Sequence, residues 1–535
     1  MSLNEEPLLI VRGGGSPLVM PEIAGSKAAQ LWRMAQLGLD VPPAFVLPTS
    51  LCVPVNAGEK DALAAVQHTL DKGIAWLEGI TGRRFGDSRA PLLVSVRSGA
   101  AASMPGMLET ILDIGLNDQT VRGLIRMSGN PRLAFDSFRR LVQGYAEVVT
   151  HVPGVGFERC LTEMMQREGV AHEMELDPEA LERLTSEFRE FALRASGRSM
   201  PTDPREQLQS AAIAVYRSWE SARAKEYRRL NHLEDLKGTA VTVQAMVFGN
   251  SGGRSGAGVA FSRNPATGVK ELYVDFLFDA QGEDVVSGRR TPGHAERLAG
   301  RLRDVAKQLA EGVTRIETEM HDAQDVEFTV EDGRLYFLQT RAAKRTPLAA
   351  LRIAVDMVHE GMIDIKTALA RLAPLDVETL GVARFATPAP AVATAISAAP
   401  GVASGIVAFD SQRAKELATT GAPVILVRPE TSTEDVEGFA LAAGILTAVG
   451  GRTAHAAVVA RQLGKVCLVG CRTLAIDAEN RTATLGDAAI REGDWLSLDG
   501  DHGEIRLGRH SIVTERPPEL AEIARWQAQA AQVPA

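Results

Sequence analysis

The chain of 535 residues has little of the composition that marks specialised classes of protein. Its four cysteines are too few and too scattered for a disulfide framework. Cys467 and Cys471 have a C-x3-C spacing, but no second pair completes a zinc site. Aromatic residues make up only 5% of the chain, so alanine, leucine and valine must supply most of the packing. We therefore predict reduced, buried cysteines in a cytoplasmic protein.

Basic residues are fewer than acidic ones, with 58 Lys and Arg against 67 Asp and Glu, which gives a net charge of −9. This balance argues against a surface that neutralises nucleic-acid phosphates, although a local basic cluster could still bind a nucleotide. The N-terminus has no basic segment followed by an apolar one, so no signal peptide is predicted. An uncharged stretch at 391–409 is long enough to cross a bilayer, but Pro400 and Gly401 interrupt it. We predict neither a nucleic-acid nor a membrane partner.

The pattern along the chain predicts a multidomain protein of the α/β and α+β classes. At roughly 150 residues per domain, the length suggests three to four domains. Short apolar runs precede a helical stretch at about 118–230, and strands return from 239. The expected helices include 136–149, 178–195, 206–230 and 295–320. The expected domains are 1–345, a helical connector with a Pro/Ala-rich linker at 346–398, an α/β domain at 399–510 and a tail at 511–535.

His455 is the first candidate for chemistry. Gly450, Gly451 and Thr453 precede it, and small alanines after it open an amphipathic helix. The N-terminus of a helix favours an anionic group, so a histidine there is suited to carry a phosphoryl group. Taken alone, it could equally be a capping or packing residue.

Two cationic residues stand next to small-residue turns. Arg97 is expected at the end of the buried strand VSV, before a loop of Gly, Ala and Ser, which suits phosphate binding. Lys27 follows Gly25 and Ser26 and opens a helix, without the spacing of a P-loop. Each could also be an ordinary solvated side chain.

A hairpin is predicted at 325–341, with strands at 325–330 and 335–340. Asp325 and Glu327 alternate on its first strand, and Gln339 and Arg341 alternate on its second. Period two places all four on one face, where carboxylate and amide oxygens could hold Mg²⁺ and the arginine could meet phosphate. The alternative is a solvated face with a cross-strand ion pair.

Several ordered segments together resemble the pyruvate phosphate dikinase family. The similar segments run from about residue 20 to 508. They are VSVRSGAAASMPGMLETILDIGLND, GNPRLAFDSFRRLVQ, VFGN with SGAGVAFSRNPATG, DAQGEDVVSGRRTP, QDVEFTVEDGRLYFLQTRAAKRT, ETSTEDVEGFALAAGILTAVGGRTAHAAVVAR and EGDWLSLDGDHGEI.

The resemblance implies a fold and a reaction. The N-terminal region is similar to an ATP-grasp nucleotide-binding region with a helical insertion, and 399–510 resembles a swivelling β/β/α phosphohistidine domain. In the family, ATP and phosphate phosphorylate the histidine and release AMP and pyrophosphate, and pyruvate then becomes phosphoenolpyruvate on a C-terminal barrel. Only 27 residues follow position 508, whereas such a barrel needs roughly 250. We therefore expect the second acceptor site outside this chain, with a separately encoded barrel subunit as one candidate.

The resemblance also implies roles for individual residues. His455 matches the phosphorylated histidine, with Arg97 and Thr453 as further catalytic positions. The metal-binding pair for Mg²⁺ would be Glu327 and Gln339. The residues matching the ATP site are Lys27, Arg97, Arg140, Ser103, Met104, Gly106, Gln244, Glu283, Asp325 and Arg341.

The sequence departs from the family pattern at several positions. Ala28 replaces a glycine next to Lys27, Ala454 replaces the serine before the histidine, and Asp275 is a shortened carboxylate. Two other functions therefore stay open. One is a catalytically degenerate, adenine-nucleotide-binding regulatory module. The other is a water-type dikinase that releases phosphate, against which the SMPGM loop argues.

Overall fold

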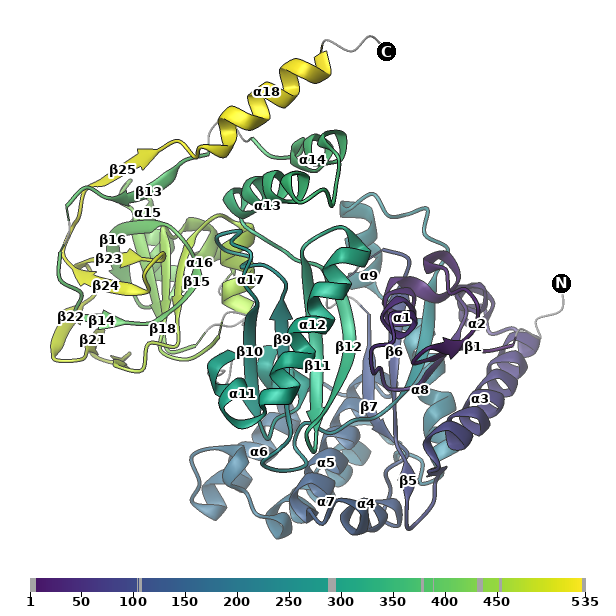
Figure 1. The fold of residues 1–535 in the computed structure, drawn as a ribbon. Helices are drawn as coiled ribbons and strands as arrows, with labels where there is room; N and C mark the ends of the chain where they lie inside the picture. The colour runs from purple at the N-terminus through teal and green to yellow at the C-terminus, as the bar shows by residue number, and fades with distance from the viewer. Residues whose placement is uncertain are drawn as a thin grey trace. The chain divides into compact units, whose positions relative to one another are not determined.

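The computed structural model describes residues 6–102, 104, 108–286, 295–376, 380–387, 389–430, 436–451 and 455–531 (Figure 1). The chain forms two compact units. Unit 1 comprises 1–252 with 336–339, and unit 2 comprises 253–335 with 340–535. Among the described residues, no helix has the length and apolar character needed to span a membrane.

Unit 1 is built on a six-stranded sheet with the order β2-β1-β3-β8-β6-β7. Its strands are β1 (Leu8–Val11), β2 (Gly14–Gly15), β3 (Ala44–Leu47), β6 (Val94–Ala100), β7 (Thr110–Ile114) and β8 (Thr239–Ala245). The helices beside it are α1 (Pro21–Gln36), α2 (Cys52–Asn56) and α3 (Lys60–Thr81), and β4 (Arg84–Phe85) pairs with β5 (Pro91–Leu92). The central strands β3, β8 and β6 are almost wholly buried.

Strand β6 extends further than the sequence suggests. The prediction ended the strand at Arg97, because Ser98, Gly99 and Ala100 read as a loop. In the structure these small residues are buried and pair with Val241, Ala240 and Thr239 of β8. Arg97 therefore lies inside a strand, where its backbone is fixed on both sides.

Six helices follow β7 in unit 1. They are α4 (Thr120–Ser128), α5 (Pro131–Val149), α6 (Val155–Glu168), α7 (Pro178–Ser196), α8 (Pro204–Ser218) and α9 (Ala222–Leu230). The prediction of a single helix at 206–230 is wrong, because the helix is interrupted between the end of α8 and the start of α9. The Ser221 side chain accepts a hydrogen bond from the Ala224 amide and so begins a new helix.

Unit 2 begins with a four-stranded sheet of order β10-β9-β11-β12. Its strands are β9 (Gly256–Phe261), β10 (Tyr273–Phe278), β11 (Gln324–Glu331) and β12 (Arg334–Ala342), and the helices are α10 (Gly282–Val286), α11 (Ala295–Arg301) and α12 (Arg303–Met320). The predicted hairpin is present. Asp332 and Gly333 both have positive φ between β11 and β12, as an Asp-Gly turn between paired strands requires.

The remainder of unit 2 contains an eight-stranded sheet of order β14-β24-β23-β16-β17-β18-β19-β15. Its strands are β14 (Ala393–Thr394), β15 (Ile396–Ala399), β16 (Val402–Ala408), β17 (Val424–Arg428), β18 (Gly444–Thr447), β19 (Val466–Val469), β23 (Trp495–Asp499) and β24 (Glu504–Leu507). The strands β16 to β19 are mutually parallel. Accompanying helices are α15 (Ser411–Ala418), α16 (Val436–Leu441) and α17 (His455–Gln462), and β20 (Leu474–Asp477), β21 (Thr482–Leu485) and β22 (Ala488–Arg491) form a small sheet.

The segments on either side of this sheet contain regular structure. The stretch predicted as a linker holds β13 (Val382–Phe385), β14 and β15, and β13 pairs with β25 (Ile512–Glu515). Helices α13 (Pro347–His359), α14 (Ile365–Leu372) and α18 (Glu519–Ala531) share an apolar cluster that includes Ile523 and Trp526 (Figure 1).

Candidate active site

Three of the predicted site residues meet in unit 1. Arg97 on β6 donates from Nη1 to Oε1 of Gln244 and from Nη2 to Oε1 of Gln339, each at 3.3 Å. Gln244 is itself anchored, because its Nε2 donates to the Pro42 carbonyl at 3.2 Å. Both glutamines are buried. The guanidinium group is thus held by two amide oxygens that carry no charge of their own, an arrangement suited to presenting a cation to phosphate.

Lys27 lies in α1 directly after a kink. Gly25 has φ +79° and ψ 157° inside the helix, and a Cβ atom there would lie 2.1 Å from the Gly99 carbonyl oxygen. The Ser26 hydroxyl donates to the Ala100 carbonyl at 3.0 Å. These contacts bring the start of the Lys27 helix against the end of β6. Gly25 keeps the left-handed geometry beside the lysine, while Ala28 is accommodated as a buried helical residue.

Arg140 is held by a residue that the sequence analysis did not single out. Its Nε donates to Oδ2 of Asp136 at 3.0 Å, and Nε of Arg139 donates to Oδ1 of the same carboxylate at 2.8 Å. Burial acts to raise the pKa of Asp136, but the neighbouring arginines outweigh it and lower the pKa to about 2. Asp136 is therefore a permanent anion that fixes two cations. Asp136 and Arg140 are four residues apart, the spacing of many exposed ion pairs on helices. Burial of its carboxylate is what distinguishes Asp136 from such pairs.

Asp325, Glu327 and Arg341 come together in unit 2. Nε of Arg341 donates to Oδ2 of Asp325 at 2.8 Å, and Nη2 of Arg341 lies 3.9 Å from Oε1 of Glu327. Burial raises the pKa of Asp325, and the charge of Arg341 opposes that rise. The predicted alternation on one strand is thus present. The cross-strand ion pair of the alternative interpretation forms as well, but Asp325 is buried and not solvated.

The donors in this group fit a hard divalent cation. Oδ1 of Asp325 is buried without a hydrogen-bond partner in the described part of the chain, and carboxylate oxygens are the ligands that Mg²⁺ prefers. Of the pair predicted to bind the metal, Glu327 belongs to unit 2 and Gln339 to unit 1. The described residues contain no cluster of three or more His, Cys, Asp and Glu side chains arranged for a metal.

Other predicted positions are described only in part. Thr453, Ser103 and Gly106 lie outside the described residues. His455 is the first residue of α17 and Glu283 belongs to α10, but their side chains are not among those described. Met104 is 8% exposed and belongs to the apolar core of unit 1, so it contributes packing there. The prediction that a helix begins at His455 is confirmed.

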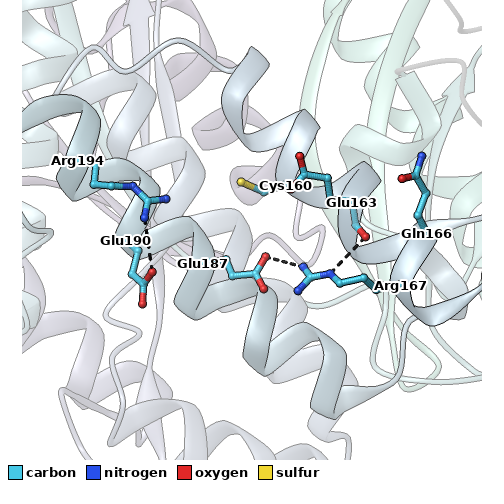
Figure 2. A pocket seen from close by; sticks show the side chains of 7 residues that line it. All are labelled: Cys160, Glu163, Gln166, Arg167, Glu187, Glu190 and Arg194. Atoms are coloured by element: carbon cyan, nitrogen blue, oxygen red, sulfur yellow. Dashed lines mark hydrogen bonds and ion pairs between the residues drawn. The ribbon is translucent and has the colours of Figure 1, made fainter.

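A separate groove of about 640 Å³ lies on helices α6 and α7 of unit 1 (Figure 2). It is lined by Cys160, Glu163, Gln166, Arg167, Glu187, Glu190 and Arg194. Arg167 pairs with Glu187 at 2.7 Å, and Arg194 lies 3.8 Å from Glu190. None of the predicted site residues lines this groove, and exposed ion pairs of this kind contribute little energy.

Comparison with known proteins gives two matching family models. The model described as pyruvate phosphate dikinase, AMP/ATP-binding domain, matches residues 60–305 and 293–362, which is more than half of the chain. The model described as PEP-utilising enzyme, mobile domain, matches residues 420–503. The second match includes His455 and four strands of the eight-stranded sheet, β17, β18, β19 and β23.

Curated relatives agree with these matches. The chain is 43% identical to pyruvate, phosphate dikinase 2 of Zea mays over 506 residues, covering 94% of this chain and 57% of that protein. It is 45% identical to pyruvate, phosphate dikinase of Clostridium symbiosum over 494 residues, covering 91% and 56%. With the chloroplastic enzyme 1 of Arabidopsis thaliana, identity is 42% over 512 residues, covering 95% and 53%. The chain spans a little over half the length of these relatives, and it belongs to the pyruvate phosphate dikinase family.

Proposed function

We propose that this chain uses ATP and inorganic phosphate to phosphorylate His455. The γ-phosphoryl group of ATP would pass to phosphate and give pyrophosphate, the β-phosphoryl group would pass to a ring nitrogen of His455, and AMP would leave. The names of the relatives support a dikinase reaction, and the match to an AMP/ATP-binding domain supports the nucleotide.

The observation that carries this proposal is the fixed position of Arg97 between Gln244 and Gln339. Phosphoryl transfer depends mainly on positioning and on neutralising charge, so a catalyst needs cations whose geometry is set in advance. Arg140 supports the same conclusion, because a buried carboxylate holds it. Lys27, at the kink against β6, would add a third phosphate contact.

Several finer assignments belong to the same proposal. The nucleotide-binding region at 1–345 would have an ATP-grasp arrangement, and 399–510 would act as the swivelling phosphohistidine domain, separated by the connector at 346–398. Thr453 would assist at the histidine, Ser103 and Gly106 would cover the phosphates, and Glu283 would contact the nucleotide. Mg²⁺, held by Glu327 and Gln339 with Asp325 and Arg341 beside them, would neutralise phosphate charge. A cytoplasmic location also remains a prediction.

The phosphoryl group would then pass to pyruvate or to another acceptor. The comparisons lend no support to the predicted separate subunit carrying a barrel, since both family models match regions of this chain itself.

Product analysis tests the proposal. The chain is incubated with ATP, Mg²⁺ and phosphate, and the AMP and pyrophosphate formed are counted per chain. We expect one equivalent of each, with no formation when phosphate is omitted and none in His455→Asn. Arg97→Gln should lower the rate by at least about a hundredfold, since removing one stabiliser of transition-state charge typically costs that much.

Other results would point to the two alternative functions. Tight ATP binding without AMP would contradict the proposal and identify a regulatory nucleotide-binding module. AMP formed together with phosphate, with no requirement for added phosphate, would identify a water-type dikinase.

A further inference from the structure

One face of the β10–β9–β11 sheet in unit 2 carries both acidic and aromatic side chains. The strand registers place Tyr273, Phe261 and Asp325 in one row across the three strands. The next row on the same face contains Asp275, Val259 and Glu327, since alternate residues of a strand share a face. This face, called the acidic face below, therefore includes the proposed metal-binding carboxylate.

Arg461 approaches the acidic face from helix α17, the helix that begins at His455. Its guanidinium carbon lies 6.0 Å from the centre of the Phe261 ring, and Asp275 and Asp325 are near enough to act on its charge. Nη1 donates to the Ala398 carbonyl on β15 at 2.9 Å. A second contact lies nearby, because the Tyr273 hydroxyl reaches the Ser397 carbonyl of β15 at 3.5 Å.

Arg461 is only 2% exposed. A buried guanidinium costs several kcal/mol of desolvation free energy unless opposite charges compensate for it. Burial lowers the pKa of Arg461, and the carboxylates of Asp275 and Asp325 on the acidic face act in the opposite direction. The apolar cluster on the acidic face contains Phe261 and Tyr273 together with residues of α13, and among the described residues it is separate from the apolar clusters around the eight-stranded sheet. The two contacts described above, from Arg461 to Phe261 and from Tyr273 to Ser397, are made by single side chains.

We propose that Arg461 is a positioning residue that docks the histidine-bearing helix onto the acidic face, with Asp275 and Asp325 as its counter-charges. The inference rests on the proposed function, because docking matters for transfer only if His455 is the phosphoryl carrier. Six residues separate the two positions, about 9 Å along a helix, so Arg461 sets the place of α17 without touching the reacting atoms. The shortened carboxylate at Asp275 then has a role as the partner of this arginine.

Hydroxyl-radical footprinting of the full chain tests the docking without requiring turnover. Phe261 and Tyr273 lie on the acidic face, whereas Phe276 and Phe328 stack on each other on the opposite face of the same sheet. We expect Asp275→Asn and Arg461→Gln to increase oxidation at Phe261 and Tyr273 and to leave Phe276 and Phe328 protected. Asp275→Asn keeps the bond from Arg461 to Ala398, so it separates loss of docking from loss of folding.

Arg506→Gln is the matched control. Arg506 is also a buried arginine on the eight-stranded sheet, and it donates to a backbone carbonyl, that of Ala389, at 2.8 Å. Its carboxylate partner Asp499, at 2.9 Å, lies on the same sheet. This variant should perturb the local packing and leave the oxidation of Phe261 and Tyr273 unchanged.

Single-turnover kinetics supply the functional readout. Arg461→Gln and Asp275→Asn should slow AMP formation at saturating ATP by at least about tenfold, because breaking a buried charge pair commonly costs more than the free energy of a tenfold change. The ATP concentration for half-saturation should not change. Exchanging the charges, in the double variant Asp275→Lys with Arg461→Glu, should recover part of the rate.

The two hypotheses fail in different ways. If oxidation of Phe261 and Tyr273 is unchanged in both Arg461→Gln and Asp275→Asn, the docking proposal is wrong, whatever rate of AMP formation is measured. If oxidation rises as expected but the wild-type chain forms no AMP, the docking stands and the proposed function is wrong.

Discussion

At the scale of single residues, Asp113 on β7 is the most unusual acid in unit 1. It is fully buried, neither carboxyl oxygen has a hydrogen-bond partner among the described residues, and its backbone has a left-handed φ of 60°. Burial raises its pKa to about 7, although the nearby charge of Arg140 opposes this rise. Asp113 is therefore protonated in the folded chain at a pH where it ionises in the unfolded chain.

This difference predicts a pH-dependent stability. The folded-state pKa lies above the unfolded value, so the free energy of unfolding should fall as the pH rises from about 4 to about 7. Asp113→Asn should remove the fall, so its effect on the free energy of unfolding should be more favourable at pH 8 than at pH 5 by at most about 3 kcal/mol. Asparagine also tolerates the left-handed backbone. Urea unfolding at both pH values measures this, and an equal change at both values would contradict the assignment.

Asp136 shows what residue-level sequence reading misses. Arg140 was identified from its resemblance to a phosphate contact, but nothing in the local pattern marked the acid four positions earlier. Its importance arises because the side of α5 that carries Asp136 is buried, which leaves the carboxylate 2% exposed between two arginines. Burial of this kind depends on helices that are distant in sequence, so spacing alone cannot predict it.

At the scale of elements, the approach of α1 to β6 is the contact most sensitive to substitution. Gly25 combines a left-handed φ with the close approach to Gly99 described above. Gly25→Ala should destabilise unit 1 by at least about 2 kcal/mol and weaken ATP binding, because strain and a backbone clash add. The matched control is Gly58→Ala, which has φ +74° but no atom within 4 Å of its Cβ position.

Thermal unfolding and nucleotide titration compare these two glycine variants. Gly58→Ala should cost only about 1 kcal/mol for its left-handed backbone and leave ATP affinity unchanged. Equal losses of stability in the two variants would show that the contact with β6 contributes nothing beyond backbone strain.

The elements also show which patterns could be read from the sequence. Alternation at 325–341 and the Asp-Gly turn predicted the hairpin, since both signals are local. The predicted end of the strand at Arg97 was wrong, because Ser98, Gly99 and Ala100 have the composition of a loop. Pairing with β8 holds them in a strand. The periodicity at 206–230 continued across a helix break, because Ser221 acts through its side chain and leaves the apolar spacing intact.

At the scale of the whole molecule, order along the chain predicted more than local pattern did. The family motifs indicated a nucleotide-binding region followed by a phosphohistidine domain, and the two matching family models follow the same order. Local reasoning left His455, Arg97 and Lys27 with ordinary structural alternatives. The structure adds the partners that hold Arg97 and Arg140 in place, and it assigns Arg461 and Asp275 to the docking of α17.

The proposed function depends on transfer of the β-phosphoryl group of ATP to His455. It is tested most directly by incubating the chain with Mg²⁺, phosphate and ATP labelled at either the β- or the γ-phosphorus, followed by peptide mapping under conditions that preserve phosphohistidine. We predict acid-labile β-label on the peptide containing His455, γ-label only in pyrophosphate, and no labelled peptide from His455→Asn. Label from the γ-position on the protein, or β-label that persists in His455→Asn, would contradict the account.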